Sequence, residues 1–386
     1  MDKVRFGIIG LGNMGSTHVM HFVAGKIKRA EISAVCDVKA DRLKWAKGVL
    51  GENVGLFTNA EQMFESESID AVLIAVPHYL HPVYAIKAMK SGIHALVEKP
   101  AGVYTKQVME MNEVADANPD IMFGIMFNQR TNPVYRKAKE LVQTGEIGNL
   151  KRVNWIITDW YRTQAYYNSS DWRATWKGEG GGVLLNQSPH QLDLLQWICG
   201  MPQKVRAFCS EGKFHDIEVE DDVTAFAEYE NGATAVFVTS TGDAPGSNRL
   251  EIQGDMGKII IEDEKLSFWK LRVSEREFCM STKQGFGMPE MWKCEIPLAG
   301  GNLQHVGIIN NFTDAIIDGV ELLADGKEGI NGVELANAMY LSSWLNDFVE
   351  IPVDSEMYYE KLKEKIKNSI SRKIVDEQIT DLSGTY

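Results

Sequence analysis

Lys99 and His190 are the residues of this sequence whose type and setting best suit acid–base chemistry. Lys99 lies in the tripeptide EKP, directly after an apolar run that is typical of a buried strand. Its backbone is restrained, because a residue before proline is kept out of the α region. His190 lies in GGGVLLNQSPHQLD, where a helix is expected to begin at Ser188-Pro189. A lysine can stabilise negative charge on an oxygen, and a histidine can accept a proton near neutral pH.

A glycine-rich turn near the N-terminus has the pattern of a dinucleotide-binding loop. Its residues Gly10, Gly12, Asn13, Met14 and Gly15 follow the apolar run VRFGIIG and precede a helix-compatible segment. The three glycines permit a tight turn, a close approach of pyrophosphate to the backbone, and close packing of helix on strand. The phosphates would then face the N–H groups at the start of the helix.

Asp37 makes this pattern more specific. It ends the second expected strand, 22 residues after Gly15, where a carboxylate can accept hydrogen bonds from ribose hydroxyls. The same charge would repel a 2′-phosphate, so NAD is the expected cofactor. Lys39 and Arg42 could neutralise that phosphate, which leaves NADP as the alternative.

Two sheets must position these residues. Over residues 1–126, short apolar runs alternate with helical patterns, which predicts βαβ units and a parallel sheet in a Rossmann dinucleotide-binding domain. Over residues 127–355, longer strand-like runs follow one another, with a hairpin signal at Asn231-Gly232. This predicts an α+β domain with an open, mostly antiparallel sheet and helices on one face. Residues 356–386 are expected to form a C-terminal helical tail.

Composition excludes several classes of function. A net charge of −13 disfavours nucleic-acid binding, which requires a basic surface. The five cysteines are widely spaced and form no CxxC pair, which indicates reduced thiols with neither disulfides nor a metal site. No apolar run approaches the ~18 residues of a membrane span, and an apolar strand begins at Val4. We therefore expect a cytoplasmic protein that binds no membrane.

A second group of residues follows the strand IDAVLIAV. Val76, Pro77, His78 and His81 lie there, and the EKP tripeptide follows the next strand. Both segments are expected at the carboxyl edge of the parallel sheet, where ligands of such sheets bind. The alternative for Lys99 is a surface salt bridge, and a histidine near a helix start is often structural.

The order GxGxxG, strand-end Asp, PxxxH, EKP and GGG…HxxD resembles the Gfo/Idh/MocA oxidoreductases, which include glucose–fructose oxidoreductase and inositol dehydrogenase. The resemblance spans about residues 4–350. It implies an active site between the two domains, with Lys99 as catalytic lysine and His190 as acid/base. It also implies assembly through the second domain, as a homodimer or homotetramer. Many relatives carry aspartate four residues before this histidine, whereas this chain has Asn186, which cannot act as a base.

The resemblance and the motifs together define the expected site. Cofactor contacts are expected from Gly10, Gly12, Asn13, Met14, Gly15, Asp37, Val76, Pro77, His78, His81, Glu98, Lys99, Trp172 and Arg173. Lys99, His190 and Asn186 are the catalytic candidates. Substrate contacts are expected from Lys99, Asn128, Tyr161, Arg162, Asn186, Gln187 and His190.

The segment from Trp155 to Trp176 is rich in aromatic residues, although Trp155 itself is expected in the sheet core. Aromatic faces combined with polar side chains suit a sugar ring or a cyclic polyol. The prediction is an NAD-dependent dehydrogenase that oxidises a secondary hydroxyl of a sugar, glycoside or cyclic polyol. The alternatives are an NAD-dependent glycosidase that works through transient ring oxidation and a non-catalytic dinucleotide-binding sensor. A sensor needs neither Lys99 nor His190.

Overall fold

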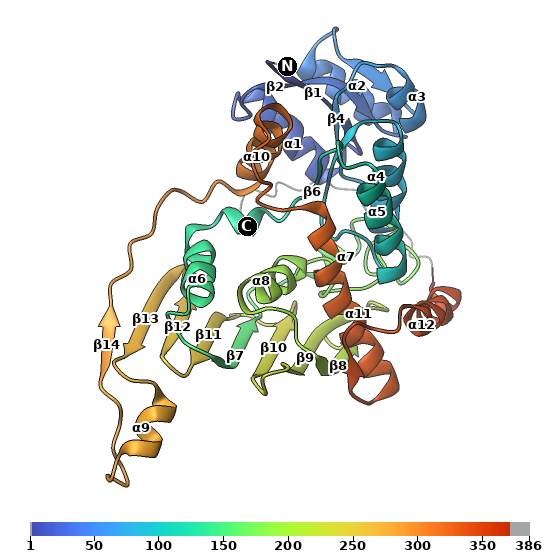
Figure 1. Ribbon diagram of the computed structural model, residues 1–386. Helices are drawn as coiled ribbons and strands as arrows, with labels where there is room; N and C mark the ends of the chain where they lie inside the picture. The colour runs from blue at the N-terminus through green and yellow to red at the C-terminus, as the bar shows by residue number, and fades with distance from the viewer. Residues whose placement is uncertain (1, 371–386) are drawn as a thin grey trace.

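The computed structural model describes residues 2–370 as two sheets with helices around them (Figure 1). The first is a six-stranded parallel sheet with strand order β3-β2-β1-β4-β5-β6. Its strands are β1 (Val4–Ile9), β2 (Ala30–Cys36), β3 (Gly55–Phe57), β4 (Ala71–Ile74), β5 (His94–Val97) and β6 (Phe123–Ile125). The helices between them are α1 (Asn13–Val23), α2 (Ala40–Leu50), α3 (Ala60–Glu65), α4 (His81–Lys90) and α5 (Thr105–Ala117), with the 3₁₀ turn η1 (His78–Leu80).

The central strands of this sheet are apolar along their whole length because both faces are covered. All four residues of β4 are buried, and in β1 only Arg5 is more than slightly exposed. Continuous apolar runs are typical of parallel strands covered by helices on both sides. This confirms the predicted Rossmann-type sheet. The short strand β3, which the sequence did not indicate, adds the outer edge.

The second sheet has nine strands in the order β14-β13-β12-β11-β7-β10-β9-β8-β15. All neighbours pair antiparallel except β7 and β10, which are parallel, so the predicted open and mostly antiparallel sheet is confirmed. Its strands are β7 (Leu150–Ile157), β8 (Lys204–Glu211), β9 (Glu220–Glu228), β10 (Thr234–Ser240), β11 (Asn248–Gly254), β12 (Gly257–Glu262), β13 (Lys265–Leu271), β14 (Met291–Cys294) and β15 (Val349–Glu350).

Helices cover one face of this sheet, as Figure 1 shows for α6, α8 and α11. Residues alternate along the strands between a buried, helix-facing side and a more exposed side, as in β10. Val153, Trp155 and Ile157 of β7 point into the helix-covered core. The Asn231-Gly232 turn joins β9 to β10 as predicted, with Gly232 at φ 81°. The remaining helices are η2 (Asn128–Thr131), α6 (Pro133–Gln143), α7 (Gln164–Tyr167), α8 (Pro189–Cys199), α9 (Glu275–Ser281), α10 (Gln304–Asp318), η3 (Gly326–Glu328), α11 (Gly329–Leu345) and α12 (Ser355–Asn368).

Helix α10 returns from the second half of the chain to the first sheet. Phe312 of α10 lies 6.3 Å from Phe6 of β1 between ring centroids, and Ile309 is fully buried in the same cluster. The core around the parallel sheet is therefore not built by residues 1–126 alone. The predicted helical tail begins with α12, and its part beyond residue 370 lies outside the described residues. Among residues 2–370, no helix is both long and apolar enough to span a lipid bilayer.

Candidate active site

The glycine turn after β1 combines two packing glycines with one that faces open space. A side chain at Gly10, which has φ 86°, would lie 2.3 Å from the Ala75 carbonyl oxygen. A side chain at Gly15 would lie 1.8 Å from the Gly10 carbonyl oxygen. Nothing lies within 4 Å of the position that a Cβ of Gly12 would take. The turn is therefore tight where helix and strand meet and open at Gly12, as a bound pyrophosphate requires.

Helix α1 presents its N-terminus to the same space. The helix begins at Asn13, Gly12 occupies the N-cap position, and no side chain caps this end. An uncapped helix start offers backbone N–H groups and the positive end of the helix dipole to an anion. Asn13 and Met14 form its first turn, as expected for residues beside the phosphates.

Asp37 lies directly beside the glycine turn. Its carboxylate accepts hydrogen bonds from the N–H groups of Leu11 at 2.7 Å and Lys39 at 2.8 Å. Arg42 donates to the Leu11 carbonyl oxygen at 2.7 Å and to the Ser16 hydroxyl at 2.5 Å. The main chain of the turn therefore already engages the Arg42 guanidinium that could have favoured a 2′-phosphate. The Asp37 carboxylate and the engaged Arg42 guanidinium together fit NAD better than NADP.

His81 joins the turns that follow β4 and β5. Its two ring nitrogens lie 2.7 Å from the carbonyl oxygens of Val76 and Pro100. The ring is almost fully buried, so it fixes the spacing between these two turns. The structure thus places Val76 and His81 at the carboxyl edge of the sheet, beside the EKP tripeptide, as predicted.

His78 links this edge to the second half of the chain. It follows Pro77, and its Nδ1 lies 3.1 Å from the carbonyl oxygen of Glu179. Its ring meets the Trp172 ring edge-on, with centroids 5.9 Å apart. Burial lowers the pKa of His78 well below its usual value, so the ring is neutral at neutral pH. Two residues expected to touch the cofactor, His78 and Trp172, are thereby brought together.

Glu98 is held by helix α1. Its carboxylate accepts from His18 Nε2 at 2.6 Å and from the Lys99 N–H at 3.2 Å. Burial opposes the charge of Glu98, but the hydrogen bond and charge of His18 outweigh it and bring the pKa to about 2. The sequence assigned Glu98 to the cofactor site, whereas its described contacts brace the EKP turn against α1.

Lys99 reaches across to the second half of the chain. The Lys99–Pro100 peptide is cis, in agreement with what the family resemblance implies. The Lys99 ammonium donates to the main-chain carbonyl oxygen of Asn186 at 2.7 Å. Burial lowers the pKa of Lys99, while the carboxylates of Glu98 and Glu179 raise it. Lys99 and Asn186, two of the three catalytic candidates, are therefore in direct contact.

His190 lies in the first turn of α8 and is 2% exposed. Neither ring nitrogen has a hydrogen-bond partner among residues 2–370. Burial, followed by the charges of Lys99 and His305, lowers the pKa of His190 well below its usual value. A buried polar group without a partner indicates a position completed by a ligand or a water. The His190 ring is therefore neutral at neutral pH.

Glu220 shapes the glycine-rich loop before His190. Its carboxylate accepts from the N–H groups of Gly182 and Leu184 at 2.9 Å each and from the Tyr340 hydroxyl at 2.7 Å. A side chain at Gly182 would lie 1.9 Å from the Glu220 carbonyl oxygen, so only glycine fits there. Burial raises the pKa of Glu220 to about 8 against these three donors. Glu220 belongs to none of the sequence motifs described above, so the sequence did not indicate its role.

Tyr166 connects several residues expected to contact the substrate with Arg173, which is expected to contact the cofactor. Its hydroxyl accepts from Arg173 at 2.6 Å and from Gln187 Nε2 at 3.2 Å, and it lies 3.5 Å from the Asn186 side-chain oxygen. The guanidinium carbon of Arg162 lies 5.2 Å from the centre of the same ring. Arg162, Arg173, Asn186 and Gln187 are thus brought together by one aromatic ring.

Other expected residues lie further from this group. Tyr161 is half exposed, and its carbonyl oxygen accepts from Arg162. Asn128 is buried on η2, where its amide donates to Gln304 at 2.5 Å. Among residues 2–370, the buried side-chain oxygen of Asn128 has no hydrogen-bond partner. Asp193 of the HxxD motif forms a buried ion pair with Arg130, so its role in the structure is to hold α8 to η2.

Two residues near the site are not among the expected contacts given above. Glu179, directly before the three glycines, is 1% exposed and accepts a hydrogen bond from the Asn186 amide. His305 of α10 packs edge-on against His18, with ring centroids 5.4 Å apart, and burial lowers its pKa to about 3. The position of Glu179 inside the conspicuous GEGGG stretch was a signal that could have been used, whereas His305 is more than a hundred residues away.

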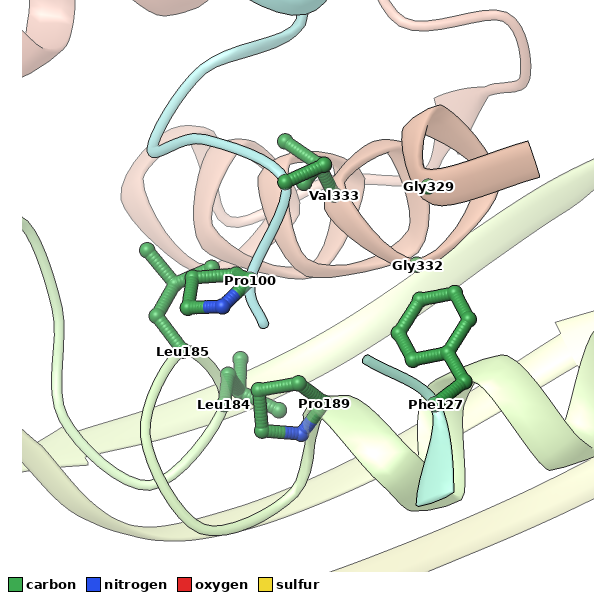
Figure 2. A pocket seen from close by; sticks show the side chains of 9 residues that line it. Pro100, Phe127, Leu184, Leu185, Pro189, Gly329, Gly332 and Val333 are labelled. Carbon is green, nitrogen blue, oxygen red and sulfur yellow. The ribbon is translucent and has the colours of Figure 1, made fainter. Parts of the chain in front are cut away.

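A small apolar pocket lies where the EKP turn meets the second half of the chain (Figure 2). Pro100, which follows Lys99, and Pro189, which precedes His190, both line it. The other lining residues are Ala101, Phe127, Leu184, Leu185, Gly329, Gly332 and Val333. The lining is almost entirely apolar, so this pocket offers a polyol few hydrogen-bond partners. In residues 2–370, no group of three or more His, Cys, Asp or Glu side chains could hold a metal ion.

Family models match both halves of the chain. An oxidoreductase family with an NAD-binding Rossmann fold matches residues 4–124, and the GFO/IDH/MocA C-terminal domain matches residues 135–260. Similar curated proteins include an uncharacterized oxidoreductase, YrbE, of Bacillus subtilis, which is 25% identical over 87% of this chain and 93% of its own length. A levoglucosan dehydrogenase of Pseudarthrobacter phenanthrenivorans is 25% identical over 91% and 99%. A myo-inositol 2-dehydrogenase of Thermotoga maritima is 26% identical over 67% and 75%.

Solved structures share the fold over most of the chain. The WlbA dehydrogenase of Chromobacterium violaceum, in complex with NADH and UDP-GlcNAcA, has a TM-score of 0.76 at 25% identity, covering 92% of this chain and 97% of that one. A levoglucosan dehydrogenase in complex with NADH and L-sorbose has a TM-score of 0.76 at 19% identity, covering 92% and 100%. With both halves matched and the dinucleotide turn in place, the chain belongs to the Gfo/Idh/MocA family of NAD-dependent oxidoreductases.

Proposed function

We propose that this protein is an NAD-dependent dehydrogenase that oxidises a secondary hydroxyl of a sugar, glycoside or cyclic polyol. The observation that carries the proposal is the buried His190, whose two ring nitrogens have no partner among the described residues, within the electrostatic reach of the Lys99 ammonium. A hydroxyl between them would meet a cationic donor and a proton acceptor at once.

NAD, when bound, accepts the hydride that leaves the carbinol carbon. Gly12, the start of α1 and Asp37 would hold its pyrophosphate and adenosine ribose, and the turns after β4 and β5 would lie toward its nicotinamide. The dinucleotide is thereby oriented by groups that already occupy their places in the fold.

Lys99 and His190 divide the remaining work. The Lys99 ammonium would stabilise negative charge as it develops on the substrate oxygen, which is most effective where water is excluded. His190 would take the hydroxyl proton on a ring nitrogen. The low pKa of His190 keeps the ring neutral and able to accept, because burial and the Lys99 charge both disfavour the imidazolium.

The surrounding side chains support a substrate with several hydroxyls. Buried polar atoms without a partner include Nε of Arg173 and Nε1 of Trp160. Tyr166 offers an apolar ring between the two guanidinium groups of Arg162 and Arg173. Relatives named for levoglucosan and inositol act on compounds of this class. Aromatic ring faces suit the C–H surface of a sugar or cyclitol, and the guanidinium and amide groups suit its hydroxyls.

The test is a screen of purified protein with NAD against polyols, free sugars and glycosides, followed at 340 nm. We expect NADH to accumulate with at least one of these compounds. Release of an aglycone without net NADH would instead assign the glycosidase alternative. Tight NAD binding with no turnover on any compound would assign the sensor alternative.

A further inference from the structure

Glu179 is a buried carboxylate that the mechanism above does not use. Its two oxygens accept hydrogen bonds from the Ala174 N–H at 2.5 Å and from the Asn186 side-chain amide. Arg173 Nη1 lies 3.7 Å from the same carboxylate. The turn that carries Glu179 is irregular, with Ala174 at φ 55°, so the local backbone departs from its favoured conformations to make these contacts.

Asn186 connects this carboxylate to Lys99. The Asn186 side chain donates to Glu179, while its main-chain carbonyl oxygen accepts the hydrogen bond from the Lys99 ammonium at 2.7 Å. One residue therefore bridges a buried anion and the cation of the site. Asn186 itself carries no charge, so any negative charge on this side of Lys99 must come from Glu179.

The charges around Lys99 are otherwise mostly positive or neutral. Two carboxylates raise the pKa of Lys99, with Glu98 acting more strongly than Glu179, and Glu98 also accepts a hydrogen bond from His18. The remaining ionisable groups that face Lys99 are Arg173, Arg162, His78, His81, His190 and His305. Two arginines beside a buried ammonium favour its deprotonation unless an anion offsets them.

We propose that Glu179 is a positioning residue that acts through Asn186: it orients the Asn186 bridge and, together with Glu98, supplies the negative charge that keeps the Lys99 ammonium protonated. This inference rests on the proposed dehydrogenase function for its kinetic readout. Burial is the largest influence on Glu179 and raises its pKa above the usual value, while Arg173, the Ala174 N–H, Asn186 and Lys99 act against burial and favour the ionised form. The hydrogen bonds described above are those that an ionised carboxylate accepts.

The test compares three variants with the wild type, using the pH profile of kcat/KM. Glu179→Gln keeps the shape but removes the charge, so the basic limb that reports Lys99 deprotonation should move down by about one pH unit. Asn186→Asp in the Glu179→Gln background returns a carboxylate to the bridge and should move the limb back up. Glu218→Gln is the matched control, because Glu218 accepts from the Trp176 N–H at 2.8 Å on the same turn and is not among the groups that act on Lys99.

A second measurement is independent of turnover. Competitive labelling of lysine amines by acetic anhydride over a pH series, read by mass spectrometry, reports the pKa of Lys99 in the protein without cofactor. The same downward shift is expected in Glu179→Gln and none in Glu218→Gln. The inference would be overturned if Glu179→Gln lost the same fraction of activity at every pH, while the basic limb of the kcat/KM profile and the midpoint of Lys99 labelling stayed unchanged. Glu179 would then have only a structural role. If the wild type oxidises no polyol but the labelling midpoint shifts, the proposed function fails and the inference about Glu179 stands.

Discussion

At the scale of single residues, Lys99 is the group whose loss separates catalysis from cofactor binding. In Lys99→Met, kcat should fall by about 10²–10³, the range observed when one donor to a developing oxyanion is removed. NAD affinity should stay close to that of the wild type, because the ammonium acts mainly on charge that develops during the reaction. Steady-state kinetics and calorimetry measure the two quantities. Lys87→Met, a surface lysine paired with Glu61, is the control and should leave both unchanged.

His190 should control the acidic side of the pH profile. His190→Ala is expected to lower kcat by about 10²–10⁴, as for a positioned general base. Because burial lowers its pKa, the wild-type acidic limb of kcat/KM should lie below pH 6.5, and the variant should lack it. Single-turnover NADH formation is the decisive measurement. Reduction of NAD by His190→Ala at the wild-type rate would remove His190 from the hydride step.

The meeting of Lys99 with the GGG…His segment could be anticipated from sequence, because both carry strong local signals. Lys99 precedes a proline and follows a strand whose carboxyl end should border the ligand, and Ser188-Pro189 marks the start of the helix that carries His190. These local patterns place both segments without three-dimensional information. Glu220 could not be placed in this way, and for Glu179 only its position inside the GEGGG stretch was a usable signal. Neither carboxylate stands at a fixed spacing from its partners, because Arg173, Asn186 and Tyr340 are recognised as partners only once the chain is folded.

At the scale of elements, the loop before α8 depends on the Glu220 carboxylate of β9. Burial raises its pKa to about 8, from about 4.5 in an unfolded chain, so the folded state binds its proton more tightly. The stabilisation this provides is complete below pH 4.5 and is lost as pH rises through 8. The loss is on the order of a few kcal/mol.

Glu220→Gln should therefore show a smaller fall in melting temperature between pH 6 and 9 than the wild type does. Calorimetry or circular dichroism at several pH values measures this. Glu262→Gln, a substitution of an exposed carboxylate at the end of β12, should reproduce the wild-type curve. A Glu220→Gln curve that parallels the wild type would mean that another group titrates.

The elements predicted from sequence are those with long or continuous apolar patterns. Strands β7 to β12 follow this description, and so do the central strands of the parallel sheet. Strands β13 and β14 were missed because their sequences, KLSFWKL and MWKC, mix lysine with aromatic residues at a sheet edge. The two-residue strand β15 exists only because it pairs with β8, which no local pattern reveals.

At the scale of the whole molecule, the second sheet leaves one face without helices in the described chain (Figure 1). Cross-strand register places Phe208, Thr224, Val238 and Ile156 in one row across this face. The Phe208 side chain is 59% exposed and that of Ile156 is 43% exposed. Apolar side chains on an open sheet face are typical of an interface between subunits.

We therefore predict a homodimer or homotetramer assembled through this face. Light scattering should give a multiple of the 43.2 kDa chain at micromolar concentration, and Ile156→Asp should shift it toward the monomer. Met109→Asp, on the exposed side of α5, is the control and should leave the assembly intact. A monomeric wild type would end this proposal.

Helix α10 has a consequence for how the protein is synthesised. Phe312 and Ile309 complete the core around β1 and β6, yet they leave the ribosome about 190 residues after Met126. At bacterial or eukaryotic synthesis rates of about 5–20 residues per second, this is a delay of about 10–40 s. During that time the nascent parallel sheet has apolar side chains that nothing from its own stretch of chain can cover. We therefore expect the apolar side chains of the nascent N-terminal region to stay exposed until α10 has been synthesised.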